Sequence, residues 1–244
     1  MANQPIDFFR QMRSGFSGIL ASASHDSETT ALALAARAVD WFEGNIAIQT
    51  EGQPSLACAK GCPTCCALRV CATAPEIFLM AAYIRRVDAT PQGAQLQLAR
   101  RVAEADAVTR GLSEQERLVA GQPCPLLVEG ICILHPVRTL ACRGHAAYVE
   151  EQCRAAAQGQ DIEVDVSEPH LTLRSLVQNA LQASLRDRGL AWGLCELNQG
   201  LALTLAEPER IAAWFAGEDS LAPAIPDLDM AALGQAFDEL NAAN

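Results

Sequence analysis

The sequence predicts a mainly α-helical protein with an irregular, cysteine-rich metal-binding centre, which contains a small β-hairpin and is packed by helices. Three observations support this fold class. Helix-start and helix-stop signals recur along the chain, eight of the ten cysteines fall into two regions between them, and strands do not alternate with helices. At 244 residues the chain can bury a sizeable core without disulfide bonds.

The first helix is expected at about 28–43, after a loosely held N-terminal arm (1–27) whose apolar periodicity is weak. The next begins at "TAPE", where Thr73 and Glu76 have the spacing of a capping box and a proline falls in the first turn. This signal predicts a helix that extends through Arg86.

The remaining helices are predicted mainly from serine, threonine or proline at their starts and glycine at their ends. They are expected at about 90–111, 113–121, 170–188, 194–206, 208–216 and 229–241. In "CPLLVEGICIL" (124–134), two short apolar runs about a Glu-Gly pair predict a small hairpin. We therefore expect three regions. They are the N-terminal arm (1–27), a cysteine-cluster metal-binding domain (28–160) and a C-terminal helical region (161–244) that packs on the same core.

Composition limits the partners and the compartment. The net charge of −11 argues against nucleic acid or an anionic membrane as the main partner. No apolar stretch approaches the length of a membrane span, and the first residues lack the pattern of a secretion signal. We therefore expect a cytoplasmic protein, in which clustered cysteines are more often metal ligands or redox groups than disulfides.

The densest cysteine motif is "CAKGCPTCC", which begins at Cys58. Cys62 and Cys65 form a CxxC pair that suits one metal ion or one face of a cluster, and Gly61 permits the tight turn that such a pair needs. Cys58 is close enough to complete three ligands. The adjacent Cys65 and Cys66 side chains diverge, so they are awkward ligands for one tetrahedral ion. The motif therefore indicates more than one metal or a polynuclear cluster.

A second region supplies four more cysteines: Cys124, Cys132, Cys142 and Cys153. Eight thiolates packed together without a cation would repel one another strongly, and a metal removes that repulsion. The set suffices for two four-thiolate sites, or for one cluster and one further ion. Iron and zinc both accept four thiolates, but a single CxxC, a vicinal pair and dispersed cysteines favour an iron–sulfur cluster over zinc.

These motifs resemble a known family. "CAKGCPTCC", "ATAPE" and "CPLLVEGICILHPVRTLACRGH" with a later cysteine are similar to the cysteine-cluster proteins of the CxxCxxCC or YkgJ type, described as zinc- or iron-chelating. The match covers about residues 55–155, and the flagellin lysine methylases share the motif, in association with an iron–sulfur centre. The resemblance implies the same eight metal ligands: Cys58, Cys62, Cys65, Cys66, Cys124, Cys132, Cys142 and Cys153. His135 and Thr139 depart from the family pattern, which affects the local turn and not the ligands.

Five other residues are candidates for core packing, for metal binding or for neutralising charge at the metal centre. Cys71 and Cys195 lie beside apolar residues and are expected in the core. His145 is a candidate supplementary ligand, although a lone histidine is more often structural. Arg138 and Arg143 could neutralise a negative metal–thiolate centre or form ordinary salt bridges.

The sequence thus predicts a protein whose partners are metal ions and whose cofactor is an iron–sulfur cluster or zinc. Two alternatives stay open. A cluster-dependent methyltransferase or redox enzyme would have a deep pocket beside the metal, whereas a structural zinc module for a protein partner would have closed four-thiolate sites. Radical S-adenosylmethionine and thioredoxin-like chemistries share parts of the cysteine spacing, but the folds that support them are not expected here.

Overall fold

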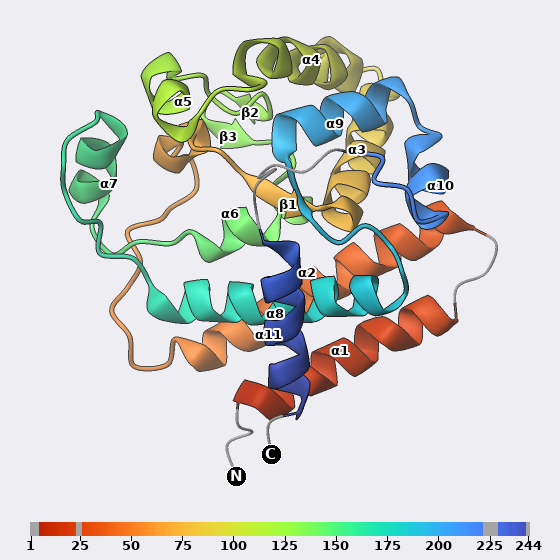
Figure 1. The fold of residues 1–244 in the computed structure, drawn as a ribbon. Coiled ribbons are helices and arrows are strands. Elements are labelled where there is room, and N and C mark those ends of the chain that lie inside the picture. Colours follow the sequence, from red (N-terminus) through yellow and green to blue (C-terminus); the bar gives the residue numbers. More distant parts are fainter. Residues whose placement is uncertain (1–4, 23–25, 222–228, 243–244) are drawn as a thin grey trace.

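The structure is a computed structural model that describes residues 5–22, 26–221 and 229–242. Of these described residues, 64% are helical and 5% are in strands, which confirms the mainly α-helical fold class. Three long helices pack together in the lower half of the view in Figure 1: α1 (Pro5–Ala21), α2 (Ser27–Gln49) and α8 (Glu168–Asp187). A second set of helices lies above them in this view.

Helix α1 buries a stripe of apolar side chains and packs against α8. The stripe recurs every three or four residues, which places it on one helix face: Phe9, Met12, Phe16 and Leu20. The prediction of a loosely held arm is therefore wrong for residues 5–21, because packing on α8 stabilises a segment whose own helix signals are weak. Residues 1–4 and 23–25 of the predicted arm lie outside the described residues.

The upper set consists of α3 (Ala74–Asp88), α4 (Leu98–Thr109) and α9 (Leu197–Ala206), with α3 also in contact with α2. Helix α3 begins as predicted, since the Glu76 carboxylate accepts hydrogen bonds from Thr73 N (2.8 Å) and Thr73 Oγ1 (2.7 Å). The capping box holds the chain in place at Thr73, shortly after the first cysteine motif.

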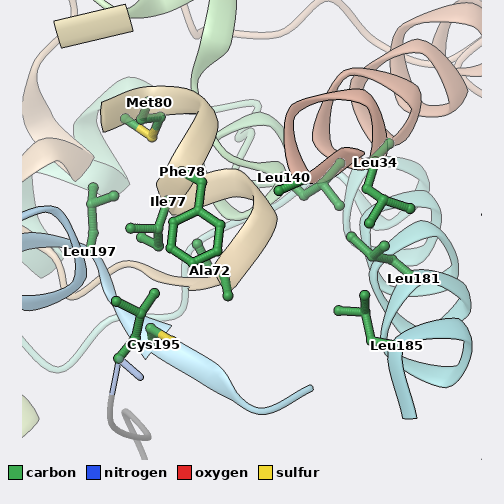
Figure 2. Close-up of a cluster of buried hydrophobic side chains, with 14 of the residues drawn as sticks. Leu34, Ala72, Ile77, Phe78, Met80, Leu140, Leu181, Leu185, Cys195 and Leu197 are labelled. Carbon is green, nitrogen blue, oxygen red and sulfur yellow. The ribbon is translucent and has the colours of Figure 1, made fainter. Parts of the chain in front are cut away.

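Two short strands pair beside α3. Strands β1 (Cys71–Thr73) and β4 (Leu194–Glu196) are antiparallel, with Ala72 opposite Cys195. Cys195 is 4% exposed and lies in the hydrophobic core (Figure 2), as predicted, whereas Cys71 is half-buried. The predicted helix over 194–206 is wrong in its first three residues, because strand pairing provides their backbone hydrogen bonds instead.

The predicted hairpin is confirmed. Strand β2 (Leu127–Val128) pairs with β3 (Ile131–Cys132). The turn residues Glu129 and Gly130 have φ angles of 50° and 77°. Both lie in the left-handed region that the commonest two-residue hairpin turn requires, and glycine adopts it without strain.

The predicted helix over 90–111 is divided. A 3₁₀ helix, η2 (Gly93–Gln95), comes first, and α4 begins only at Leu98. The Asp88 carboxylate at the end of α3 accepts hydrogen bonds from Leu98 N (3.1 Å) and Ala99 N (3.0 Å). This carboxylate satisfies the free N–H groups at the start of α4, so the boundary depends on a residue about ten positions earlier.

The structure has five further α-helices and two further 3₁₀ helices among the described residues. They are α5 (Glu114–Ala120), α6 (Leu140–Gly144), α7 (Glu150–Ala157), α10 (Arg210–Phe215) and α11 (Met230–Ala242), with the 3₁₀ helices η1 (Thr64–Ala67) and η3 (His135–Val137). Helices α5, α10 and α11 lie where the sequence predicts them, whereas α6 and α7 were not predicted. Among the described residues, no helix is long and apolar enough to cross a membrane.

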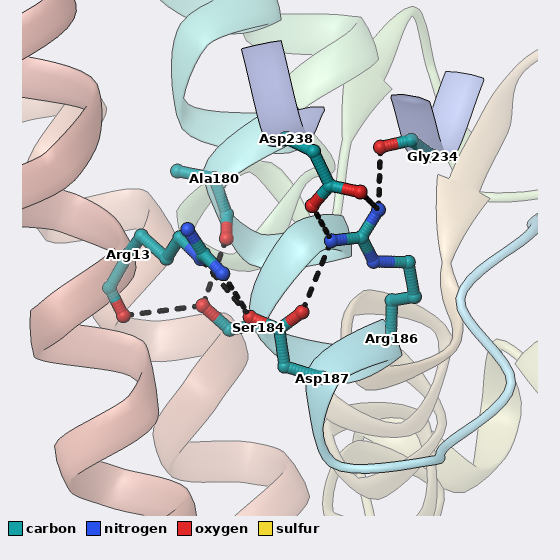
Figure 3. Close-up of polar contacts among 7 residues, drawn as sticks. All are labelled: Arg13, Ala180, Ser184, Arg186, Asp187, Gly234 and Asp238. Atoms are coloured by element: carbon teal, nitrogen blue, oxygen red, sulfur yellow. Dashed lines mark hydrogen bonds and ion pairs between the residues drawn. The ribbon is translucent and has the colours of Figure 1, made fainter. Parts of the chain in front are cut away.

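Arg186 of α8 fixes the C-terminal helix (Figure 3). Its guanidinium donates to the Gly234 carbonyl and forms an ion pair with Asp238, both on α11. The neighbouring Asp187 accepts a hydrogen bond from Arg13 of α1. Because Asp238 is 65% exposed, its ion pair contributes little to stability, and the network mainly orients α11 against α8 and α1.

Candidate metal centre

The first cysteine motif forms a tight loop that leads into η1. Cys62 N donates to the Ala59 carbonyl (3.1 Å), and Cys66 N donates to the Pro63 carbonyl (2.8 Å). Gly61 has a φ of 91°, so the turn uses the backbone freedom that the sequence assigns to this glycine. These contacts hold four cysteines on one short segment.

The second cysteine region lies against this loop. Cys124 N donates to the Cys66 carbonyl at 2.8 Å. The hairpin turn also contacts the loop, since a Cβ built at Gly130 would lie 3.8 Å from the Gly61 carbonyl oxygen. The fold therefore brings together two cysteine regions that are far apart in the sequence.

Four cysteines surround a small hollow, and we call them the outer group: Cys58, Cys62, Cys65 and Cys153. Together with His145 and Ala147, they line a volume of about 20 Å³. Cys153 reaches it from α7, which packs against η1. Ala147 N donates to the Cys58 sulfur at 3.4 Å. Burial, with a further contribution from the other outer-group thiols, raises the pKa of Cys153.

The other four cysteines form the inner group: Cys66, Cys124, Cys132 and Cys142. Cys142 lies on α6, and its N–H donates to Oγ1 of the N-cap residue Thr139 at 3.2 Å. Burial raises the pKa of Cys124 to about 12 and also raises the pKa values of Cys132 and Cys142. The fields of the neighbouring thiols add to the rise for Cys124 and Cys142. These thiols therefore stay protonated at neutral pH unless a cation lies beside them.

Cys65 and Cys66 connect the two groups. The Cys66 thiol donates a hydrogen bond to Cys65, which lowers the pKa of Cys65 to about 7 and raises the pKa of Cys66. Cys65 lines the outer hollow, whereas the Cys66 thiol interacts electrostatically with Cys124 and Cys142. The two adjacent side chains thus belong to different groups while they remain in contact. A partly ionised Cys65 is in the form that binds metals.

Arg138 is a cation close to both groups. Its charge contributes to the low pKa of Cys65 and opposes the raised pKa values of Cys132 and Cys142. Its Nε is buried and has no hydrogen-bond partner within the described part of the chain. A buried donor without an acceptor is costly, so Arg138 is suited to stabilise negative charge on the sulfurs.

Arg143 and His145 differ in their relation to the sulfurs. Arg143 forms an ion pair with Glu43 and donates to the carbonyls of Arg138 (3.0 Å) and Pro136 (2.7 Å). Of the two roles that the sequence left open for Arg143, the structure therefore shows the salt bridge. His145 lines the outer hollow, and burial lowers its pKa. The neutral imidazole is the form that binds metals, which keeps His145 a candidate ligand.

The eight thiols lie together without forming a finished ligand shell. Over residues 5–22, 26–221 and 229–242, no three His, Cys, Asp or Glu side chains already stand where they could hold one metal ion. The donor set nevertheless fits a thiolate-binding metal, because each group has four thiols and Arg138 has an unpaired buried donor. Metal binding at either group would require the cysteine side chains to turn.

Two residues that position the inner group were not predicted to do so. Glu76, expected only as a helix cap, also accepts a hydrogen bond from Leu140 N at 2.7 Å through its Oε1. This bond holds the start of α6 two residues before Cys142. Thr139, noted only as a departure from the family pattern, is the N-cap of the same helix. The threonine before Cys142 was a usable local signal, whereas the bond across 64 residues from Glu76 had none.

No family model, no curated protein and no solved structure matches the chain. The resemblance to the cysteine-cluster family therefore stays a prediction that rests on the motif residues. The function has to be inferred from the site itself, through the chemistry of eight thiols, one nearby histidine and one arginine whose buried Nε has no hydrogen-bond partner in the described part of the chain.

Proposed function

We propose that this protein binds iron or zinc through the outer and inner groups, with an iron–sulfur cluster as the preferred form. The observation that supports the proposal is that eight free thiols, from two regions far apart in the sequence, form two adjacent groups. The neighbouring residues Cys65 and Cys66 connect these groups, since one belongs to each. Buried cysteines that act only as small apolar residues do not need to be grouped, whereas a metal or cluster requires such a group. Each group contains sulfurs from both regions, so a metal in either one would join the first loop to the later segment.

The electrostatics of the site agree with this proposal. Burial raises the pKa of Cys124 to about 12, so the inner group is poorly suited to carry bare thiolates. A bound metal ion deprotonates the thiols that coordinate it, and Arg138 would compensate part of the remaining negative charge. Metal binding would then stabilise the fold, by on the order of 10 kcal/mol for structural zinc in finger peptides.

The size of the outer hollow favours metal binding over catalysis. Its volume of about 20 Å³ has room for an ion or a water molecule, and an iron–sulfur cluster would need the cysteine side chains to turn outward, whereas pockets for organic substrates measure several hundred Å³. A larger cleft between α1, α2 and α8 is lined by no cysteine among the described residues. No observation therefore specifically supports a methyltransferase or redox enzyme.

Serine substitutions test the assignment of the cysteines. Cys62→Ser in the outer group and Cys132→Ser in the inner group are expected to lower metal content and melting temperature together, because site formation and folding are linked. Cys195→Ser is the control, since Cys195 is buried in the core away from both groups. It is expected to leave the metal content per folded protein unchanged. Elemental analysis of protein purified without oxygen measures the metal.

The same variants distinguish one metal centre from two. If the groups hold separate sites, Cys62→Ser and Cys132→Ser each retain the metal of the other group. If they hold one cluster, either substitution removes all of it. Equal metal loss in these variants and in Cys195→Ser would show that the cysteines have been assigned wrongly.

A further inference from the structure

A cleft of about 1240 Å³ lies between α1, α2, α8 and the segment 163–166. It is separate from the outer hollow, although α7 borders both: Cys153 lines the hollow and Gln152 lines the cleft. The cleft is half-open to solvent and exceeds the 300–1,000 Å³ typical of small-molecule sites. Its size fits a segment of polypeptide better than a single metabolite.

The floor of the cleft is aromatic and aliphatic. Phe8 and Trp41 pack edge to face, with ring centroids 5.6 Å apart, and Leu173 also lines the cleft. The Trp41 indole N–H is buried and has no hydrogen-bond partner among the residues described. At the edge of the cleft, Ile48 is 67% exposed. These side chains offer apolar surface to a ligand.

Three carboxylates from one short segment line the cleft: Glu163, Asp165 and Glu168. All three are exposed, and none forms a salt bridge with a described residue. The lining contains no lysine, arginine or histidine from the described chain. The backbone of Asp165 is fixed, because its N–H donates to the Gln152 side chain (2.8 Å) and its carbonyl accepts from Tyr148 N (2.9 Å). The cleft therefore presents negative charge from a fixed position.

We propose that this cleft binds an extended peptide segment of a partner protein, in which a lysine or arginine adjoins an apolar side chain. The basic side chain would meet the carboxylates, and the apolar side chain would cover the aromatic floor. Side-chain amides in the lining, among them Gln11 and Gln49, can pair with the peptide backbone. A second copy of this chain is a poor occupant, since its net charge of −11 would bring like charges together. This inference does not depend on the metal.

Selection from a random twelve-residue peptide library displayed on phage tests the proposal with the full-length protein. Enriched peptides are expected to contain lysine or arginine next to leucine, valine or an aromatic residue. One enriched peptide, synthesised with a fluorescent label, then gives affinities by fluorescence anisotropy. In NMR spectra, it should shift the indole N–H signal of Trp41, which Trp41→Phe identifies.

Matched variants locate the binding to the cleft. Neutralising the three carboxylates (Glu163→Gln, Asp165→Asn, Glu168→Gln) is expected to weaken the peptide about tenfold. The control carries the same charge change on exposed acids around α10 (Glu209→Gln, Glu218→Gln, Asp219→Asn) and should change affinity less than twofold.

A second pair of variants tests the apolar contact. Ile48→Ser should weaken the peptide several-fold, whereas Val119→Ser, at an 83% exposed valine outside the cleft, should leave it unchanged. The proposal is overturned if no peptides are enriched, if they lack basic residues, or if the cleft and control variants bind equally. It is also overturned if the Trp41 signal does not move. Competition by free spermidine at the peptide's own concentration would show a site for small cations instead.

Discussion

Replacing Glu76 with alanine tests the hydrogen bonds that position α6 and its cysteine. Glu76 is 4% exposed, and its carboxylate accepts from Thr73 N (2.8 Å), Thr73 Oγ1 (2.7 Å) and Leu140 N (2.7 Å). The substitution leaves two backbone N–H groups buried without this acceptor, at about 1–3 kcal/mol for each. Burial raises the pKa of Glu76, so relief from burying the carboxylate offsets part of this cost. We expect the free energy of unfolding to fall by about 3 kcal/mol.

Glu116 provides a matched control. It forms the same capping box at α5, accepting from Ser113 N (2.8 Å) and Ser113 Oγ (2.7 Å). It differs in being exposed and in making no hydrogen bond to a distant segment of the described chain. The difference between Glu76→Ala and Glu116→Ala therefore isolates the effect of burial and of the bond to Leu140.

Guanidinium and thermal unfolding of both variants, followed by circular dichroism, measure that difference. For a chain of this size, a loss of 3 kcal/mol corresponds to a decrease in melting temperature of about 6–12 °C. Glu116→Ala should change the melting temperature by a small fraction of this amount. If the two variants lose equal stability, the reasoning is refuted, because the buried bond to Leu140 would then contribute nothing beyond the local cap.

Two further predictions concern stability. Burial lowers the pKa of His170 below its ordinary value of 6.5, so the unfolded chain binds the proton more tightly and stability is lost as the pH falls through 6.5. Between pH 7.5 and 5, His170→Gln should lose less stability than the wild type, by at most about 1.4 kcal/mol per pH unit, and parallel stability curves would contradict this. In the second, Gly200→Ala puts a Cβ 3.2 Å from Ile77 and should destabilise by about 1–3 kcal/mol, whereas Gly18→Ala, with no atom within 4 Å, should stabilise α1 by about 0.5–1 kcal/mol. Thermal unfolding of the two glycine variants would contradict the packing argument if Gly200→Ala were neutral.

Elements with local signals were predictable. The start of α3 at Thr73 and the turn at Gly130 depend on residues a few positions apart, and both are found where the sequence predicts them. The start of α4 was not predictable, because its capping carboxylate comes from Asp88 of another helix. Pairing of β4 with β1 and packing of α1 on α8 depend in the same way on distant partners. Local patterns predict the elements that carry their own signals, whereas distant contacts decide the type or the boundaries of the others.

For the candidate site, too, the local signals were predictable and the distant contacts were not. The sequence predicts that eight cysteines act together, and the fold does bring the two regions side by side. Which four thiols form each group was not predictable. That division depends on the backbone bond from Cys124 to Cys66 and on α7, which brings Cys153 to the outer hollow. The identity of the metal stays a prediction, because zinc and iron accept the same sulfur ligands.

Analysis of iron, zinc and labile sulfide in the wild-type protein, purified without oxygen, tests the central claim most directly. We expect brown protein that contains iron and sulfide in similar amounts and that bleaches on reduction or on exposure to air. Colourless protein with stoichiometric zinc and no sulfide would remove the preference for iron and leave the metal site in place. Folded protein that contains neither metal, and whose outer- and inner-group thiols all react freely with a thiol reagent, would contradict the account.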